Sequence, residues 1–147
     1  MERGAIDVGE LAGPFDLQAT LESGQSYLWN RADGETYAEL HAHGGDAWYE
    51  TVVDPIPGVT DERVAVRVRQ EGDAHDGTLH WEASTDAEPL LTHLLRLDDD
   101  LDAILDATPD LPLLERAYDA YDGMRLTRDP VFPCLISFIC SAQMRVA

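Results

Sequence analysis

The sequence predicts an α+β protein in which an antiparallel sheet comes first along the chain and helices follow. Short segments with period-two alternation, separated by turn signals, fill most of the first 85 residues. Leucines at helical spacing dominate the stretch from residue 86 onward. No segment between the strands is long enough for the crossover helix that a parallel pair requires, so the sheet is expected to be antiparallel.

The expected strands succeed one another between turns. The first covers 15–22, where apolar and polar residues alternate strictly. A turn over 23–26 ends it, because Gly24 supplies the conformational freedom that a tight turn needs. Asp33-Gly34 is a hairpin signal. Further strands are expected at 36–42, 47–53, 63–70 and 77–84.

Four helices are predicted after the strands. They cover 86–97, 98–108 and 110–123, and the last begins at Asp129-Pro130, where an acidic N-cap precedes proline at the first helical position. Residues 131–140 are apolar nearly all round, which predicts a helix buried on every side. Only three short helices precede it, so its neighbours are expected from the sheet folding back over it or from more protein.

The composition is strongly acidic. Asp and Glu number 29 against 10 basic residues, giving a net charge of −19, and every basic residue is arginine. Two interpretations stay open: a surface solvated by carboxylates, as in proteins of a very salty cytoplasm, or an ordinary acidic protein that avoids nucleic acid. At molar salt the Debye length falls to roughly 3 Å, so the charge would not exclude DNA binding. A soluble, cytoplasmic chain without signal peptide or membrane contact is expected.

Few residues indicate a catalytic or metal-binding site by themselves. His41 and His43 share a strand face, where a metal pair is conceivable but a solvated face is the simpler interpretation. Asp98-Asp99-Asp100 can bind a hard cation, yet an acidic helix start explains it more simply. No phosphate loop, Ser/His/Asp order or zinc spacing occurs. Neither a metal nor a cofactor is therefore predicted.

Two further sets of side chains have structural interpretations. Cys134 and Cys140 are expected to be small buried hydrophobes in a reducing compartment, too far apart on one helix to bridge each other. Arg63, Arg67 and Arg69 are expected to form a basic stripe on one strand, the densest positive patch of the chain.

Two segments carry a family resemblance. LESGQSYLWNR (21–31), after an alternating strand, and DGMRLTRDPVFPCLISFICSAQMRV (122–146) together resemble the N-terminal half of the helix-hairpin-helix DNA glycosylases of the 8-oxoguanine type. The resemblance extends over most of the chain through the order of strands and the leucine-rich LLRLDDDLDAIL (94–105). It implies a sheet domain like that of TATA-binding protein over 1–85 and the start of a helical glycosylase domain over 86–147.

The resemblance implies a role for each motif. Such enzymes turn the damaged nucleotide out of the duplex into a pocket. The turn containing Gly24, Gln25 and Ser26 is expected to line that pocket, with the Gly24 carbonyl accepting the N7 hydrogen that oxidised guanine has and guanine lacks. After SFICS, the positions of Gln143, Met144 and Arg145 are expected to contact DNA: Gln143 at the orphaned opposite base and Met144 as an apolar wedge.

The catalytic groups of the family are missing. The resemblance implies a lysine that forms a Schiff base and an assisting aspartate, both of which follow the helix-hairpin-helix motif in the family. This sequence contains no lysine and no segment that resembles that motif. The chain is therefore expected to be the front part of a longer enzyme with AP lyase activity, inactive alone and completed by a helical domain on the same chain or a separate subunit.

Three alternatives stay open beside this hypothesis. Gln143 followed by an apolar residue is also similar to alkylpurine glycosylases. The chain is alternatively a non-catalytic DNA-binding module or split-gene subunit, or an unrelated small-molecule-binding domain. Ending the chain at Ala147 should leave Leu135, Ile136, Phe138 and Ile139 short of neighbours, which predicts a marginal or self-associating chain in low salt.

Overall fold

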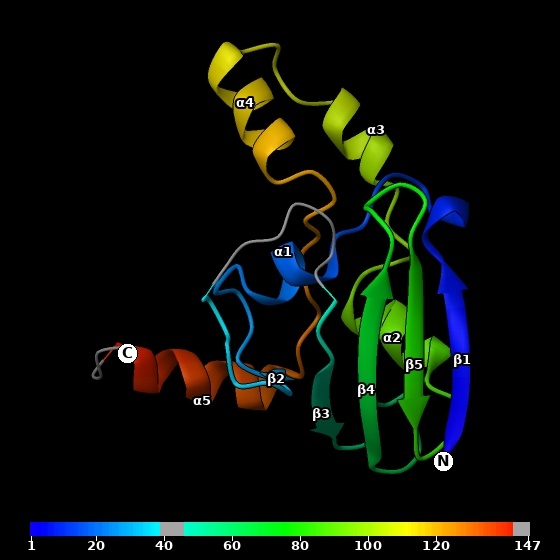
Figure 1. Ribbon diagram of the computed structural model, residues 1–147. Helices are drawn as coiled ribbons and strands as arrows, with labels where there is room; N and C mark the ends of the chain where they lie inside the picture. Colours follow the sequence, from blue (N-terminus) through cyan, green and yellow to red (C-terminus); the bar gives the residue numbers. More distant parts are fainter. Residues whose placement is uncertain (39–45, 143–147) are drawn as a thin grey trace.

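A five-stranded antiparallel sheet forms the body of the computed structural model, which describes residues 1–38 and 46–142 (Figure 1). The strand order is β1-β5-β4-β3-β2, so the first strand pairs with the last. The strands are β1 (Glu2–Asp7), β2 (Asn30–Arg31), β3 (Tyr49–Val53), β4 (Val64–Glu71) and β5 (Thr78–Ala83). The predicted α+β class and antiparallel sheet are confirmed.

Strands β3, β4 and β5 lie where the alternation predicted them. Along β4, Val64, Val66 and Val68 are buried while Ala65 and Arg67 face outward. Val66 pairs across with Thr51 on one side and with residue 83 on the other, which keeps the buried faces of three strands in register. The period of two therefore identified both the strands and their core face.

The prediction of a strand over 15–22 is wrong. A short helix, α1 (Leu17–Leu21), occupies this segment, and the Asp16 carboxylate caps it by accepting a hydrogen bond from the Ala19 amide at 2.8 Å. Gln18 and Thr20 are as buried as the leucines beside them. Polar and apolar residues of this segment are buried alike, so their alternation did not indicate a strand with one buried and one exposed face.

Two other strand assignments also change. The predicted strand at 36–42 is wrong over residues 36–38, which form turns, and its remainder lies outside the described residues. Strand β1 was not predicted. It is an edge strand with no buried side chain, so it lacks apolar alternation, and Gly4 allows the Trp81 ring to lie against its backbone.

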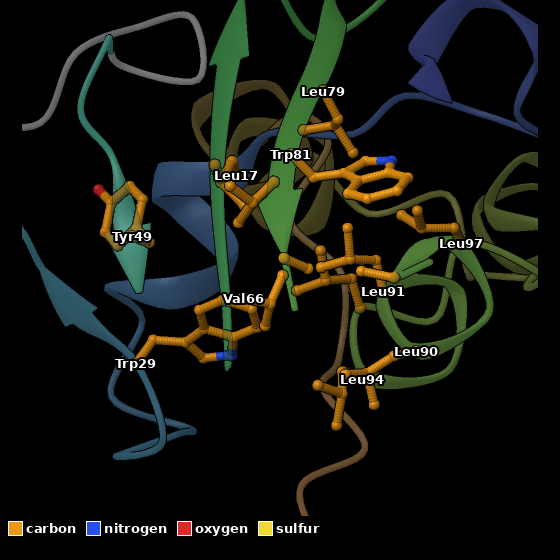
Figure 2. Packing of buried hydrophobic residues seen from close by; sticks show 14 of the residues in the cluster. Leu17, Trp29, Tyr49, Val66, Leu79, Trp81, Leu90, Leu91, Leu94 and Leu97 are labelled. Atoms are coloured by element: carbon orange, nitrogen blue, oxygen red, sulfur yellow. The ribbon is translucent and has the colours of Figure 1, made fainter. Parts of the chain in front are cut away.

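The hydrophobic core lies between the sheet and α2 (Glu88–Leu94). Figure 2 shows Trp81 of β5 gathered with Leu91 and Leu97, and Trp29 beneath Val66 of β4. Leu90, Leu91 and Leu94 are fully buried. Helix α2 thus covers the inner face of the sheet (Figure 1), and Leu17 and Leu21 of α1 belong to the same core. The predicted boundary between residues 85 and 86 stays a prediction.

The remaining helices lie outside this core. They are α3 (Leu101–Asp106), α4 (Pro112–Ala120) and α5 (Val131–Ser141), and none has a buried residue. Figure 1 shows α3 and α4 extending beyond one end of the sheet, with α5 beside β2 near the other. The prediction that α5 is buried on every side is wrong for the described residues, whereas the expected exposure of Leu135, Ile136, Phe138 and Ile139 is confirmed. Among the described helices, none is both long and apolar enough to cross a membrane.

Candidate functional site

The turn that follows α1 presents a backbone carbonyl at the surface. Gly24 has φ +81° in the left-handed region, and no other atom lies within 4 Å of the place where a Cβ would sit. The Ser23 hydroxyl donates to the Thr20 carbonyl at 3.0 Å and holds the entry to the turn. Within residues 1–38 and 46–142, the Gly24 carbonyl accepts no hydrogen bond. It is thus an exposed acceptor at a fixed place.

Gln25 ties this turn to a segment one hundred residues away. Its side-chain amide donates to the carbonyls of Thr20 at 3.0 Å and Arg125 at 2.7 Å, and its side-chain oxygen accepts from the Thr127 amide at 2.9 Å. These bonds occupy both ends of the amide. Gln25 therefore fixes the turn, and its polar atoms are committed to the protein.

Ser26 continues the same link. Its hydroxyl donates to Asp129 Oδ2 at 2.5 Å, and its oxygen accepts from the Leu28 amide at 3.2 Å. The prediction that Asp129 caps the following helix is wrong, because the N-cap residue of α5 is Pro130 and no side chain caps that end. The Asp129 carboxyl turns toward the 23–26 turn instead.

The Asp129 carboxyl lies in an unusual environment. Its Oδ1 is buried and has no hydrogen-bond partner within the described part of the chain. Burial raises the pKa of this carboxyl, while hydrogen bonds from Ser26 and Thr127 act in the opposite direction. A buried carboxyl oxygen without a donor is costly, and that cost is lower when the carboxyl is protonated, in keeping with the raised pKa.

A cavity of about 320 Å³ opens beside this carboxyl. The turn, the β2–β3 edge and the start of α5 enclose it, and its apolar wall comes from Tyr27, Leu28, Val52, Pro130, Pro133 and Phe138. The rings of Tyr27 and Phe138 meet edge to face at 6.1 Å. The polar wall comes from Gln25, Asn30, Thr51, Asp129, Cys134 and Ser137. The volume falls at the lower end of small-ligand pockets, roughly 300–1,000 Å³.

The segment 123–129, here called the linking segment, is held by Arg125. Only 3 % of this arginine is exposed, and its guanidinium donates to five backbone carbonyls. Those carbonyls belong to Ala12, Gly13, Pro14, Arg96 and Asp99. Burial lowers the pKa of Arg125, and nearby aspartates, Asp99 first, oppose that change. Sequence reasoning missed this residue because nothing in the sequence distinguishes a buried arginine from a surface one.

Further bonds fix the linking segment to the sheet region. The Asp16 amide donates to the Gly123 carbonyl at 2.8 Å, and the Arg128 amide donates to the Leu94 carbonyl at 2.8 Å. The Arg125 amide donates to the Thr20 hydroxyl at 3.1 Å. The linking segment is therefore a fixed wall of the candidate site.

The predicted basic stripe is paired with acids. Arg63 binds Asp54, Arg67 binds Glu82, and Arg69 binds Asp46 and Glu71. Arg67 and Arg69 also lie over the Trp48 ring, at 4.7 and 5.5 Å. The three arginines share one face as predicted, but their charge is compensated. This face is not a free positive surface for a phosphate backbone.

The candidate metal ligands take structural positions where they are described. Asp100 caps α3 by accepting from the Ala103 amide at 2.9 Å, while Asp98 and Asp99 bind Arg128. The interpretation as an acidic helix start is confirmed for Asp100. His41 and His43 lie outside the described residues. Within the described ranges, no three His, Cys, Asp or Glu side chains form a metal-binding group.

The cysteines are not buried hydrophobes, so that prediction is wrong. Cys134 is half-buried in the cavity wall and Cys140 is exposed, both as free thiols. Of the predicted site residues, Gly24, Gln25 and Ser26 come together in one turn. Gln143, Met144 and Arg145 lie outside the described residues, so their predicted DNA contacts stay predictions.

Comparison with known proteins gives one family. The family model described as "8-oxoguanine DNA glycosylase, N-terminal domain" matches residues 8–135, which include the turn, the linking segment and the first part of α5. No curated protein and no solved structure matches the chain.

Proposed function

Because the chain belongs to the family of 8-oxoguanine DNA glycosylase N-terminal domains, which are parts of DNA-repair glycosylases, we propose that it recognises oxidised guanine turned out of duplex DNA. Family membership supports DNA repair in general. The lesion itself is our proposal, and it rests on the turn at residues 23–26.

The exposed Gly24 carbonyl is the observation that carries this proposal. Oxidation at C8 puts a hydrogen on N7 of guanine, so an acceptor placed at N7 favours the damaged base. With normal guanine the same acceptor would face a lone pair and stay unpaired. The Gly24 carbonyl has no partner in the described chain, and Gln25 holds the turn through two hydrogen bonds to the linking segment and a third to the Thr20 carbonyl. A rigid acceptor of this kind suits discrimination better than a mobile one.

Recognition is the part of the reaction that we assign to these 147 residues. A Schiff-base mechanism needs a lysine nucleophile, and the sequence contains none. We propose that the lysine and aspartate for glycosylase and AP lyase chemistry come from a helical domain, on the same polypeptide or on a separate subunit. The alternative of an alkylpurine glycosylase rests on Gln143 and is kept as an outcome of the test below.

We also propose that the protein works in a salt-rich cytoplasm. The net charge of −19 opposes contact with DNA at low ionic strength, and screening removes that opposition in concentrated salt. Because Arg63, Arg67 and Arg69 are paired with carboxylates, they do not attract the DNA phosphates from a distance. We therefore expect DNA binding to depend on direct contacts.

The test is fluorescence anisotropy in concentrated potassium chloride with duplexes carrying 8-oxoguanine, guanine or an alkylated purine. We expect tighter binding to the 8-oxoguanine duplex and loss of that preference in Gly24→Ala, because alanine disfavours φ +81° and moves the carbonyl. Gly58→Ala is the matched control, since Gly58 has the same φ of +81° and open space around it. Both variants therefore put alanine at the same φ in open space.

The outcomes separate the candidate functions. Preference for 8-oxoguanine that Gly24→Ala loses and Gly58→Ala keeps would support the proposal. Preference for the alkylated purine would favour the alkylpurine alternative. Equal binding of all three duplexes by the wild-type chain would contradict the recognition of oxidised guanine by this turn.

A further inference from the structure

The direction of the Gly24 carbonyl depends on the residues that flank this glycine. Glycine itself adopts positive and negative φ about equally readily. Apart from its two chain neighbours, no atom of the described chain lies within 4 Å of the place where its Cβ would sit, so no packing at that position holds it. Support comes from Ser23 on one side, whose hydroxyl donates to the Thr20 carbonyl at 3.0 Å, and from Gln25 on the other.

Gln25 supplies the long-range part of this support. Its side-chain amide donates to the carbonyls of Thr20 at 3.0 Å and Arg125 at 2.7 Å, and its side-chain oxygen accepts from the Thr127 amide at 2.9 Å. An amide group has two N–H donors, and both are used within the protein. Gln25 cannot donate to a bound base without breaking one of these bonds, so it acts on the base through the turn.

The far end of this connection is itself fixed. Arg125 and Thr127 belong to the linking segment, which the buried Arg125 guanidinium holds through five backbone carbonyls. The Arg128 amide adds a bond to the Leu94 carbonyl at 2.8 Å. Gln25 therefore joins a turn that contains a flexible residue to a segment that is fastened to the sheet region.

We propose that Gln25 is a positioning residue for lesion recognition, which holds the Gly24 carbonyl at the N7 edge of the base without touching the base itself. This inference rests on the proposed function and names the side chain on which its selectivity depends. A mobile carbonyl could turn away from the N7 lone pair of normal guanine and avoid an unfavourable contact, whereas a carbonyl held in place cannot. Release of the turn should therefore strengthen binding of normal guanine relative to 8-oxoguanine.

The test is the ratio of the dissociation constants for guanine and 8-oxoguanine duplexes, measured by fluorescence anisotropy in concentrated potassium chloride. In Gln25→Ala we expect this ratio to fall about tenfold toward one. A variant that is partly unfolded loses affinity for both duplexes by the same factor, so the ratio reports the position of the carbonyl and not the stability of the chain.

Gln70→Ala is the matched control, because Gln70 makes the same set of bonds at the other end of α1. This fully buried glutamine accepts from the Leu17 amide at 2.8 Å and donates to the carbonyls of Phe15 at 2.9 Å and Asp73 at 2.8 Å. None of these partners belongs to the 23–26 turn or to the linking segment. We expect Gln70→Ala to be less stable than wild type and to keep the wild-type ratio.

A second variant covers the case in which Gln25→Ala folds poorly. Gln25→Met keeps the length of the side chain and removes its hydrogen bonds, so it leaves less empty space than alanine and should lower the ratio as much. An unchanged ratio in both Gln25 variants would overturn the inference. An equal fall in Gln70→Ala would also overturn it, because any loosening of α1 would then have the same effect.

A measurement without DNA separates this inference from the proposed function. ¹⁵N relaxation of the free chain should show the Gly24 amide changing from an order parameter of about 0.85 to below about 0.6 in Gln25→Ala, and unchanged in Gln70→Ala. Lesion preference that survives in Gln25→Ala would leave the proposed function standing and remove the inference. A wild-type chain without lesion preference, whose Gly24 amide still becomes mobile in Gln25→Ala, would contradict the proposed function and support the positioning of the turn by Gln25.

Discussion

The sheet region and the helices α3–α5 differ in how each treats its apolar residues. In the sheet region, nineteen buried hydrophobic residues of the described ranges form one cluster between the strands, α1 and α2. Helix α5 is more apolar along its length, yet Val131 and Phe132 are 83 % and 73 % exposed. Apolar composition therefore does not decide burial. A face is buried only where the topology supplies a partner, and the described chain supplies one to α2 but not to α5.

The linking segment connects α4 to α5 and is hydrogen-bonded to the sheet region. Removing the side chain that holds it should therefore cause the largest loss of stability. Arg125→Ala would remove the hydrogen bonds that the buried guanidinium donates to five backbone carbonyls, which should lower the free energy of unfolding by about 4 kcal/mol. Lysine would not restore it, because an ammonium lacks the planar five-donor fork. Urea unfolding in concentrated potassium chloride measures this change.

Arg116→Ala is the control for this prediction. Arg116 is exposed on α4, so its replacement should change the free energy of unfolding by no more than about 0.5 kcal/mol. Similar values for the two variants would mean that the linking segment is not fastened by the buried guanidinium.

A pair of leucine truncations tests the contrast itself. Leu91→Ala empties a fully buried position of α2 and should cost about 3 kcal/mol, whereas Leu135→Ala on α5 should cost less than about 0.5 kcal/mol. Leu135 is 55 % exposed, so its truncation leaves no cavity. Thermal or urea unfolding of both variants, at equal protein concentration, gives the comparison directly. A large loss from Leu135→Ala would show that α5 is covered in solution.

The same contrast explains how much of the fold the sequence could predict. Strands β3, β4 and β5 each have one buried and one exposed face, so alternation identified them. Strand β1 has no buried side chain and α1 is buried on polar and apolar positions alike. In both cases the pattern of hydrophobicity and the pattern of burial are unrelated, and no periodicity argument can succeed.

The candidate site was predictable only in its local part. A glycine between polar residues predicted the turn at Gly24, and the family resemblance implied its role in lining the lesion pocket. Asp129 was assigned as a helix cap because an Asp-Pro pair is a local signal, whereas its contact with Ser26 joins positions 103 apart. Arg125 reaches carbonyls up to 113 positions away. Contacts of that range depend on the finished topology, which the local sequence does not contain.

The smallest expected effect concerns a polar cluster inside the sheet region. The Tyr49 hydroxyl donates to Glu22 Oε1 at 2.6 Å, and the same carboxylate binds Arg31 and the Tyr37 amide. Tyr49→Phe removes one donor and leaves the other two, so the free energy of unfolding should fall by about 1.5 kcal/mol near neutral pH. Tyr121→Phe, at the residue that follows α4, is the control, because Tyr121 is 53 % exposed.

This cluster should also make the sheet region sensitive to alkali in a way that α3–α5 are not. Burial, and then the hydrogen bond to Glu22, raises the pKa of Tyr49 above that of a free phenol. The unfolded chain releases this proton near pH 10 while the folded chain keeps it, so the stabilisation is complete below pH 10 and is lost as the pH rises further. Urea unfolding at about pH 8 and about pH 11 should show the advantage of wild type over Tyr49→Phe shrinking with alkali. An advantage that stays constant would mean that the phenol ionises equally in both states and is not held by Glu22.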